Sequence, residues 1–396
     1  MIAMAGFPGL PKLSFLLIGG GLGFAAWRMR QKTADSDKKL ALAEKQAAAS
    51  PAAAQENLEN LLKVEPLAVE VGLGLVKLVE GGPNSPLLRR ISGIRRQLAS
   101  DLGYLLPPVR VMDNLSLRAS EYVISVKGVE LSRYELREGF ELAIPVDKVA
   151  GQIEGDQTVE PAFGMKALWI PRSQGDNARN MGYTVVDAIN VLGTHLAELL
   201  QRHAHELFSR QDTKAFLDRI SADSPKVVED LVPKLLPLAV VQRVLQNLLR
   251  ERVSIRDGVS ILESMGEAAA TTQNATLLTE YVRQSIRRSL VQPYLNRNGE
   301  LCAYFLDPSM EQMVESAVEH REQYSHLTLG PQQIRTIVER IERRIGRPEA
   351  PVLAICSAGG RFFFRQMVEA SVPNLFFISH NEVPSGVRVV SLGVVQ

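Results

Sequence analysis

The chain has 396 residues, 45% of them hydrophobic and 22% charged, so it can bury several cores without covalent cross-links. Its 45 basic and 44 acidic residues nearly cancel, which excludes the strong positive field typical of nucleic-acid-binding proteins. Its two cysteines, Cys302 and Cys356, lie too far apart in sequence to suggest a disulfide framework or a metal motif. We expect two free thiols in a reducing compartment.

The N-terminal segment differs from the rest of the chain. Residues 13–27 carry no charge, and the apolar character reaches back to Ala5 with only Lys12 interrupting it. A helix over residues 5–27 is long enough to span a bilayer if Lys12 extends to the interface. The basic residues that follow place the C-terminal side in the cytoplasm. They are Arg28, Arg30, Lys32, Lys38 and Lys39. The alternatives are a buried helix and a cleaved signal peptide, but a signal peptide carries its positive charge before the apolar run.

Residues 28–65 are predicted to form a linker, since the stretch 33–62 is rich in Ala, Lys, Glu and Gln. Folded structure is expected from Pro66. The run LAVEVGLGLVKLV predicts a strand over 67–79, and Ser85-Pro86 predicts the start of a helix that ends at Gly103. PPVRVMDN and EYVISVKGVEL have the alternation of strands, and residues 140–187 suggest a small strand-rich module.

A long helix is predicted over 188–208, because its apolar residues recur at helical spacing. Residues 209–290 remain helical, with interruptions at Pro233 and Pro237. The last hundred residues alternate again. Strands are expected at GELCAYFL, PVLAICS and NLFFISH, and helices at PQQIRTIVERIERRIG and GRFFFRQMVEAS.

The sequence shows no recognisable catalytic motif. Gly72-Leu73-Gly74 lacks the third glycine of a dinucleotide loop, and GGPNSP lacks the lysine of a phosphate loop. His195, His203 and His205 have no carboxylate or cysteine pattern that completes a zinc site. The arginine clusters RRISGIRRQ and RIERRIGR are interpreted as solvated helix faces. We therefore expect no catalytic residue, no cofactor and no metal.

Several stretches together resemble the FlhA family, the export-gate proteins of the bacterial flagellar type III secretion apparatus. They are VGLGLVKLVE, LGYLLPPVRVMDNLSLRASEYVISVKGVEL, EPAFGMKALWIP, GYTVVD, THLAELLQRHAHELFSRQDT, TLLTEYVRQSIRRSLVQPY and SHNEVPSGVRVVSLGVV. The injectisome gate, the SctV family, is similar, but the LLTEYVRQ and closing SHNEVP…SLGVV stretches favour the flagellar branch. The resemblance extends from about Pro8 to the C-terminus.

The resemblance implies an α+β multidomain fold with one N-terminal transmembrane helix, a linker and four cytoplasmic subdomains. Subdomain 1 (α/β) is expected at 66–138 and 188–207, and subdomain 2, a small strand-rich α/β insertion, at 139–187. The all-helical subdomain 3 is expected at 208–287, the α/β subdomain 4 at 288–386, and a C-terminal tail at 387–396. The family's earlier membrane spans and their proton-coupling residues have no counterpart here, which suggests a fragment, a truncated gene model or a split gene.

The resemblance also implies partners and a site. The expected partners are flagellar export chaperones carrying late substrates, the export ATPase complex, other export-gate membrane proteins and further copies of this chain in a ring, at the inner membrane and without nucleic acid. The chaperone-binding positions of the family fall on Glu160, Phe163 and Thr194. The family commonly has Asp at the position of Glu160, which leaves one hydrogen-bond geometry open.

The residues themselves give a partial check. Thr194 lies off the apolar stripe of its helix and can face a groove, whereas Phe163 is either a core residue or an exposed contact in a loop. Three other readings of the chain stay open: an injectisome gate, a membrane-anchored α/β enzyme and an inert relic.

Overall fold

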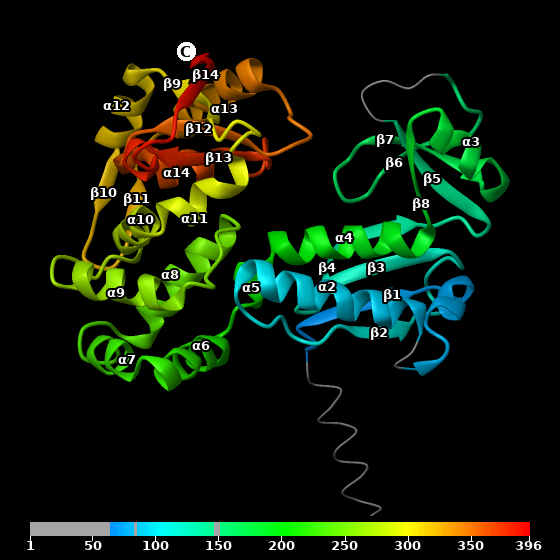
Figure 1. Cartoon of the computed structure of the whole chain (residues 1–396), viewed down its shortest axis with the longest axis horizontal. Coiled ribbons are helices and arrows are strands. Elements are labelled where there is room, and N and C mark those ends of the chain that lie inside the picture. Colours follow the sequence, from blue (N-terminus) through cyan, green and yellow to red (C-terminus); the bar gives the residue numbers. More distant parts are fainter. Residues whose placement is uncertain (1–63, 83–84, 146–150) are drawn as a thin grey trace, which may run out of the picture. The chain divides into compact units, whose positions relative to one another are not determined.

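The computed structural model describes residues 64–82, 85–145 and 151–396. The chain divides into two units, Met1–Glu65 and Pro66–Gln396, and nearly all of the described structure belongs to the second (Figure 1). None of the helices in the described ranges combines the length and apolar character that a bilayer span requires. The expected span at 5–27 and most of the linker lie outside the described residues.

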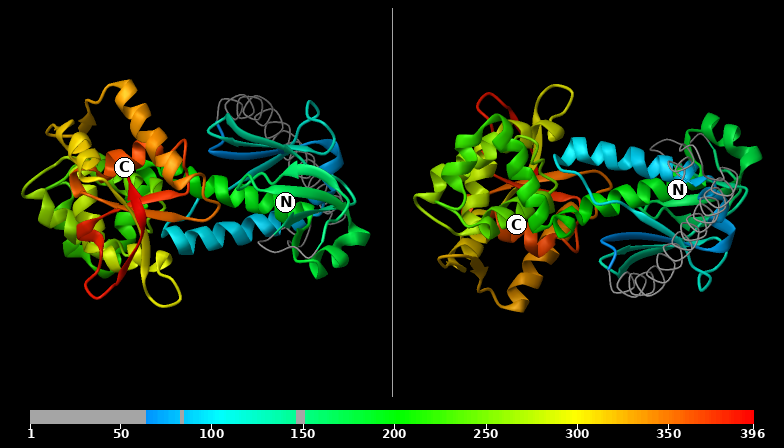
Figure 2. Two further views of the ribbon diagram at one scale, coloured as in Figure 1. Left: turned by 90° about the horizontal axis from the view of Figure 1, so that it is seen from above. Right: turned by 90° about the horizontal axis from the view of Figure 1, so that it is seen from below.

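The first sheet has four strands in the order β2-β1-β3-β4, with β1 parallel to β2 and the other pairs antiparallel. The strands are β1 (Leu67–Val71), β2 (Arg110–Asp113), β3 (Glu121–Val126) and β4 (Val129–Glu135). Two helices, α2 (Pro86–Leu102) and α4 (Ala188–Arg202), lie side by side in this region in all views (Figure 1 and Figure 2). Their apolar faces and the sheet share one hydrophobic core.

The start of this region corrects one prediction. The strand expected over 67–79 ends at Val71, and Leu73–Leu78 form a 3-10 helix, η2. Gly72 lies so close to the loop before β3 that a Cβ atom there would overlap the carbonyl oxygen of Arg118. The glycine therefore permits a close backbone approach that ends the strand.

Helix α2 has the predicted boundaries. The Ser85 hydroxyl accepts a hydrogen bond from the Leu88 amide at 3.2 Å, Pro86 occupies the first helical position, and Gly103 ends the helix with φ +87°. A side chain at Gly103 would also meet the backbone of Arg256. Left-handed geometry and close packing thus both favour glycine at this helix end.

The predicted strand-rich module over 140–187 is confirmed as an antiparallel sheet in the order β6-β7-β5-β8. Its strands are β5 (Phe140–Pro145), β6 (Asp156–Val159), β7 (Lys166–Pro171) and β8 (Tyr183–Val186), with the short elements η4 (Arg172–Gln174) and α3 (Gly175–Asn180) between β7 and β8. Asp187 then caps α4 by accepting from the Asn190 amide.

The chain from 204 to 291 is mostly helical, as predicted, but the expected helix over 188–208 is interrupted at His203. The helices are α5 (Ala204–Leu207), α6 (Arg210–Asp223), α7 (Pro225–Leu231), α8 (Leu238–Arg250), α9 (Gly258–Ala269), α10 (Ala275–Ser285) and α11 (Arg287–Val291). Their buried side chains continue the core of the first sheet without a break.

The last region is a parallel sheet in the order β13-β12-β9-β14. Its strands are β9 (Leu301–Leu306), β12 (Val352–Cys356), β13 (Leu375–Ser379) and β14 (Val389–Val395); the short η5 (Gln292–Tyr294) precedes β9, and β13 is followed by η6 (His380–Glu382). The helices are α12 (Pro308–Ser316), α13 (Pro331–Ile345) and α14 (Ala358–Val368), and a hairpin joins β10 (Val318–His320) to β11 (Ser325–Leu327). Side chains alternate between two cores, as parallel strands buried on both faces require.

Strand β14 corrects a second prediction. Residues 387–396 were expected as a tail, but β14 pairs in parallel with β9 and forms an edge of the sheet. The apolar alternation of its sequence is therefore that of a structural strand.

Candidate functional site

Glu160 lies directly after β6, in the turn that leads to β7. Its side chain is 4% exposed and its two carboxylate oxygens accept hydrogen bonds from the amides of Ala162 at 2.9 Å and Phe163 at 2.7 Å. The backbone closes the same turn, since the Glu160 amide donates to the Met165 carbonyl at 2.8 Å. Glu160 thus points into its own turn and fixes the backbone that carries Phe163.

Phe163 is exposed. Its side chain keeps 46% of its accessible surface, and Gly164 follows it with φ +74°, a conformation that glycine adopts without strain. The reading of Phe163 as a core residue therefore does not hold. An exposed aromatic ring on a turn held by side-chain hydrogen bonds suits contact with a partner.

Thr194 lies on α4, partly buried, between the fully buried neighbours Gly193 and His195. A cavity of about 140 Å³ lies between α2, α4 and the turn after β6, and both Thr194 and Phe163 line it. Ile94 and Leu98 of α2 supply apolar walls. The structure thus brings two of the three expected positions to one cavity, whereas Glu160 does not line it.

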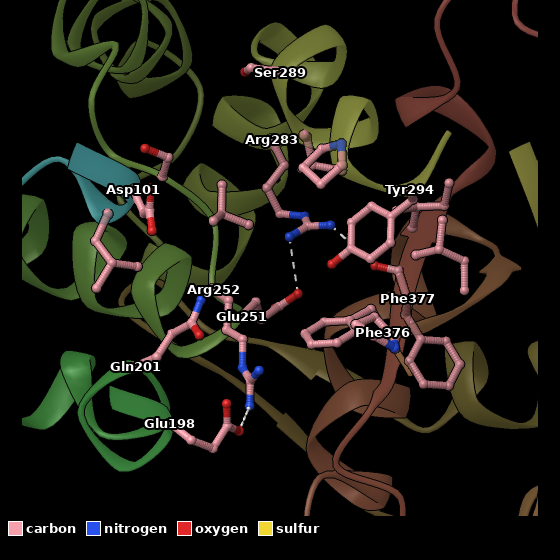
Figure 3. A pocket seen from close by; sticks show the side chains of 18 of the residues that line it. Asp101, Glu198, Gln201, Glu251, Arg252, Arg283, Ser289, Tyr294, Phe376 and Phe377 are labelled. Carbon is pink, nitrogen blue, oxygen red and sulfur yellow. Dashed lines mark hydrogen bonds and ion pairs between the residues drawn. The ribbon is translucent and has the colours of Figure 1, made fainter. Parts of the chain in front are cut away.

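A larger cavity of about 730 Å³, drawn in Figure 3, adjoins the first. Phe163 lines both cavities. Three residues absent from the sequence prediction also line both cavities: Asp101, Glu198 and Gln201. The far wall carries Tyr294 and Phe376, whose rings pack at 5.8 Å. We call the two cavities together the groove.

One charge pair crosses the groove wall. The Arg252 guanidinium, just after α8, donates to the Glu198 carboxylate of α4 at 2.6 Å (Figure 3). Arg202 donates to the same oxygen at 3.0 Å. Arg252 also lies 5.8 Å from the ring centre of Phe376. The negative charge of Glu198 is therefore balanced inside the protein.

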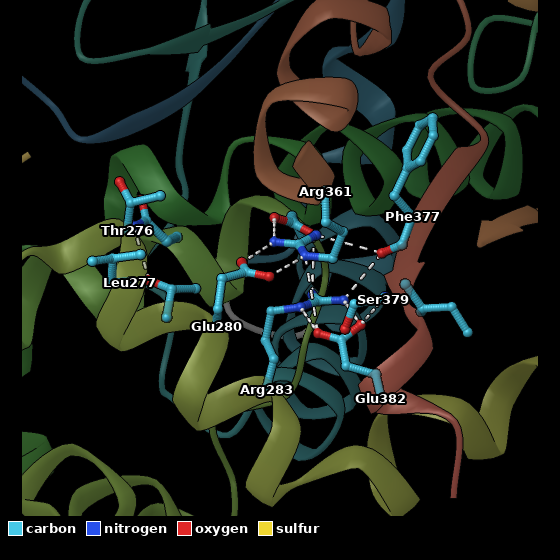
Figure 4. Close-up of polar contacts among 12 residues, drawn as sticks. Thr276, Leu277, Glu280, Arg283, Arg361, Phe377, Ser379 and Glu382 are labelled. Carbon is cyan, nitrogen blue, oxygen red and sulfur yellow. Dashed lines mark hydrogen bonds and ion pairs between the residues drawn. The ribbon is translucent and has the colours of Figure 1, made fainter. Parts of the chain in front are cut away.

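A buried ion-pair network, drawn in Figure 4, contributes Glu251 and Arg283 to the lining of the larger cavity. Arg361 of α14 donates to both oxygens of Glu251 at 2.5 and 3.0 Å and to both oxygens of Glu280 at 2.7 and 2.5 Å. Arg283 of α10 donates to Glu382 at 2.7 and 3.1 Å and to Glu251 at 3.0 Å. The network joins α8 and α10 to the parallel sheet.

The network controls the pKa values of its carboxyl groups. Burial alone raises the pKa of Glu251, but the adjacent Arg361 and Arg283 outweigh it and lower the value to about 2. Burial dominates for Glu280, whose pKa is raised although Arg361 opposes the shift. The sequence gives no sign of this network, because charged residues on amphipathic helices are normally assigned to the solvent face.

His195 lies in the core, against the first sheet. His195 is 2% exposed, and its Nδ1 atom lies 2.8 Å from the hydroxyl of Tyr122. Burial and then Arg202 lower the pKa of His195 to about 4, so the ring is neutral at neutral pH. Cys302 and Cys356 are free thiols, as expected. Across 64–82, 85–145 and 151–396, no three His, Cys, Asp or Glu side chains are grouped to hold a metal ion.

Comparison with known structures addresses the fold. The structure of the Chlamydia pneumoniae CdsV protein covers 84% of this chain and 98% of its own, with a TM-score of 0.76 at 23% identity. The nonameric EPEC SctV-C covers the same shares with a TM-score of 0.69 at 20% identity. The mixed α/β fold is thus shared with these proteins.

The chain is similar in sequence to flagellar proteins. The flagellar biosynthesis protein FlhA of Bacillus subtilis is 34% identical over 383 residues, covering 96% of this chain and 56% of its own length. The FlhA protein of Caulobacter vibrioides is 35% identical over 394 residues, covering 98% of this chain and 56% of its own length. This chain spans just over half the length of these relatives, and the predicted resemblance to FlhA is confirmed. With a match to the FHIPEP family over residues 1–388 in addition, the chain belongs to the FHIPEP family.

Proposed function

We propose that this chain is a component of the bacterial flagellar type III protein export apparatus, where it docks export chaperones with their late substrates and passes the substrates to the export gate. Similarity to flagellar FlhA proteins over nearly the whole chain carries the proposal. The groove supplies the docking surface, because it combines an exposed aromatic ring with apolar walls and a few polar groups. The proposal assigns the chain no catalytic reaction and no cofactor.

Within the groove, Phe163 is the apolar anchor, Thr194 a polar contact beside it and Glu160 a positioning residue. Aromatic anchors commonly dominate binding energy, whereas polar neighbours fix the orientation of the partner. Glu160 acts through the turn that it closes, since its carboxylate is occupied by two backbone amides.

The wider assembly is part of the proposal. EPEC SctV-C and the EscV cytosolic domain are described as nonameric, which supports assembly of this chain into a ring. Further proposed partners are the export ATPase complex and other export-gate membrane proteins. The apolar segment 5–27 would anchor the chain in the bacterial inner membrane, with the following residues in the cytoplasm.

The proposed subdomains are those expected from the sequence, with one change. They comprise 66–138 with 188–207, the insertion 139–187, the helical part 208–287, and a fourth part that we extend from 288 through β14. Pairing of β14 with β9 supports this extension.

Replacement of Phe163 by alanine tests the docking site. If Phe163 is the anchor, Phe163→Ala weakens binding of a purified, substrate-loaded late export chaperone from the same bacterium by about 1–3 kcal/mol, measured by titration calorimetry. Tyr281→Ala is the matched control, because Tyr281 is exposed to the same 46% and lies outside the groove. Unchanged affinity of a folded Phe163→Ala protein would remove this site from the proposal.

An injectisome export gate is the second candidate, because the solved neighbours include injectisome-type SctV proteins. The sequence relatives at 34–35% identity are flagellar proteins and favour the first candidate. Deletion of the gene separates the two: loss of flagellar filaments with needle secretion intact supports the flagellar assignment, and the reverse result supports the injectisome.

A further inference from the structure

Asp101 is an acidic residue in an electrostatically unfavourable place. It lies in the last turn of α2, where the carbonyl end of the helix dipole repels negative charge. Its side chain is exposed and, among the described residues, it has no hydrogen-bond or ion-pair partner. No hydrogen bond or ion pair among the described residues therefore accounts for this carboxylate as part of the fold.

The backbone around Asp101 is held firmly. The carbonyl of Leu102 accepts from the Ile255 amide at 2.8 Å, and the carbonyl of Gly103 accepts from the Arg219 guanidinium at 2.9 Å. The two residues that follow Asp101 thus each hydrogen-bond to the helical region that begins at α5. The carboxylate of Asp101 is therefore carried on a fixed backbone.

Asp101 also supplies the uncompensated charge of the groove. It lines both cavities together with Glu198, but the carboxylate of Glu198 is occupied by Arg202 and Arg252. The neighbouring Gln97 and Gln201 are neutral amides. Among the described residues that line the smaller cavity, Asp101 is therefore the acidic residue without an ion-pair partner.

The smaller cavity has the size of one apolar side chain. Its volume is about 140 Å³, and Ile94, Leu98 and Phe163 supply apolar walls. A cavity of about 150 Å³ with such walls accommodates a benzene molecule. One branched aliphatic side chain or one small ring fits this space, with Asp101 beside it.

We propose that Asp101 is a specificity-determining residue of the docking groove, which pairs with a lysine or arginine of the export chaperone next to an apolar side chain that fills the smaller cavity. The inference rests on the proposed function and adds the chemistry of the segment recognised: an apolar residue with a basic neighbour. Pairing at an exposed rim accelerates association and makes it sensitive to salt.

Binding of the substrate-loaded chaperone to the full chain tests the inference. We expect Asp101→Asn to weaken binding roughly 3- to 10-fold at low salt, and Asp101→Lys by more, because the lysine repels the basic residue of the partner. The salt dependence of the association rate should be flatter for Asp101→Asn than for the parent chain. Asp223→Asn is the control, since Asp223 is an exposed aspartate in the last turn of α6 that lines neither cavity.

Three outcomes are decisive. Loss of affinity and of salt dependence in Asp101→Asn, with Asp223→Asn unchanged, supports the inference. An Asp101→Asn protein that binds like the parent while Phe163→Ala binds weakly overturns the inference and leaves the docking site in place. If Phe163→Ala also binds like the parent, both the inference and the docking site are wrong. Because Asp101, Phe163 and Asp223 are exposed, the variants should fold, which thermal unfolding verifies.

Discussion

Glu160 stabilises the turn that presents Phe163, because its carboxylate accepts hydrogen bonds from the backbone amides of Ala162 and Phe163. Glu160→Ala leaves the amides of Ala162 and Phe163 without these acceptors, and we expect it to lower the unfolding free energy by about 1–3 kcal/mol. Chaperone affinity should fall with it. An aspartate can accept from amides two and three residues ahead, so Glu160→Asp should retain most of both properties. Amide hydrogen exchange at 162 and 163 measures the effect directly, and equal protection in Glu160→Ala and the parent would contradict the assigned role.

His195 makes stability depend on pH. Its pKa is about 4 in the folded chain and 6.5 as an ordinary histidine, so below about pH 6.5 the unfolded chain binds a proton that the folded chain does not. Protonation therefore favours unfolding, and the loss grows as the pH falls toward 4. Between about pH 7 and pH 5.5 we expect His195 alone to cost about 1 kcal/mol of unfolding free energy.

Urea denaturation at the two pH values measures this loss. His205, whose pKa burial also lowers to about 4, contributes a second increment. His195→Asn preserves an acceptor for Tyr122 and should remove about half of the combined pH dependence, whatever it does to stability at neutral pH. The same pH slope in the variant and the parent would show that His195 does not carry it.

At the scale of elements, the sequence predicted helices and strands well where capping residues, prolines or glycines mark their ends. Ser85, Pro86 and Gly103 bound α2 because capping and left-handed geometry are local properties. The strand expected over 67–79 failed because an apolar run alone does not report the close approach of Gly72 to a distant loop. The sequence analysis did not predict strand β14. Its partner, β9, lies far upstream at Leu301–Leu306, and pairing between strands so distant in sequence produces no local sequence pattern.

The groove was predictable only in part, for the same reason. Phe163 and Thr194 lie in separate segments of the sequence, and only the resemblance to the family assigned them to one site. In the structure both line one cavity. Asp101 gave a weak signal, an acid in the last turn before a helix-ending glycine. Glu198 gave no sequence signal, because its pairing with Arg252 joins α4 to the end of α8, which is distant in sequence.

The ion-pair network fixes α8 and α10 to the parallel sheet. Arg361→Met leaves the buried carboxylates of Glu251 and Glu280 without their main partner, and we expect a loss of about 3–5 kcal/mol of unfolding free energy. Arg361→Lys keeps the positive charge but loses the bidentate hydrogen bonds. Its unfolding free energy should therefore lie between those of the parent chain and Arg361→Met. Chemical denaturation measures both, with the exposed Arg335 replaced by methionine as the control. An Arg361→Met protein as stable as this control would contradict a structural role for the network.

At the scale of the whole molecule, the boundary at Pro66 separates two tasks. The unit Pro66–Gln396 contains the hydrophobic cores, the groove and the ion-pair network, all built from its own residues. The segment before it carries the apolar run and the basic residues that we propose for the membrane. Docking and anchoring should therefore be separable by cutting the chain between them.

Cell fractionation tests this separation. The chain with residues 5–27 should sediment with membranes and resist extraction by salt and by carbonate, because about twenty apolar residues partition into the hydrocarbon core. Residues 66–396 expressed alone should leave the membrane fraction, unfold cooperatively and bind the chaperone with the affinity of the full chain. In spheroplasts, external protease should spare everything after Trp27, since the basic residues that follow it favour the cytoplasmic side. A full chain that carbonate releases from the membrane, or a C-terminal part that the protease digests, would contradict the proposed anchor and its orientation.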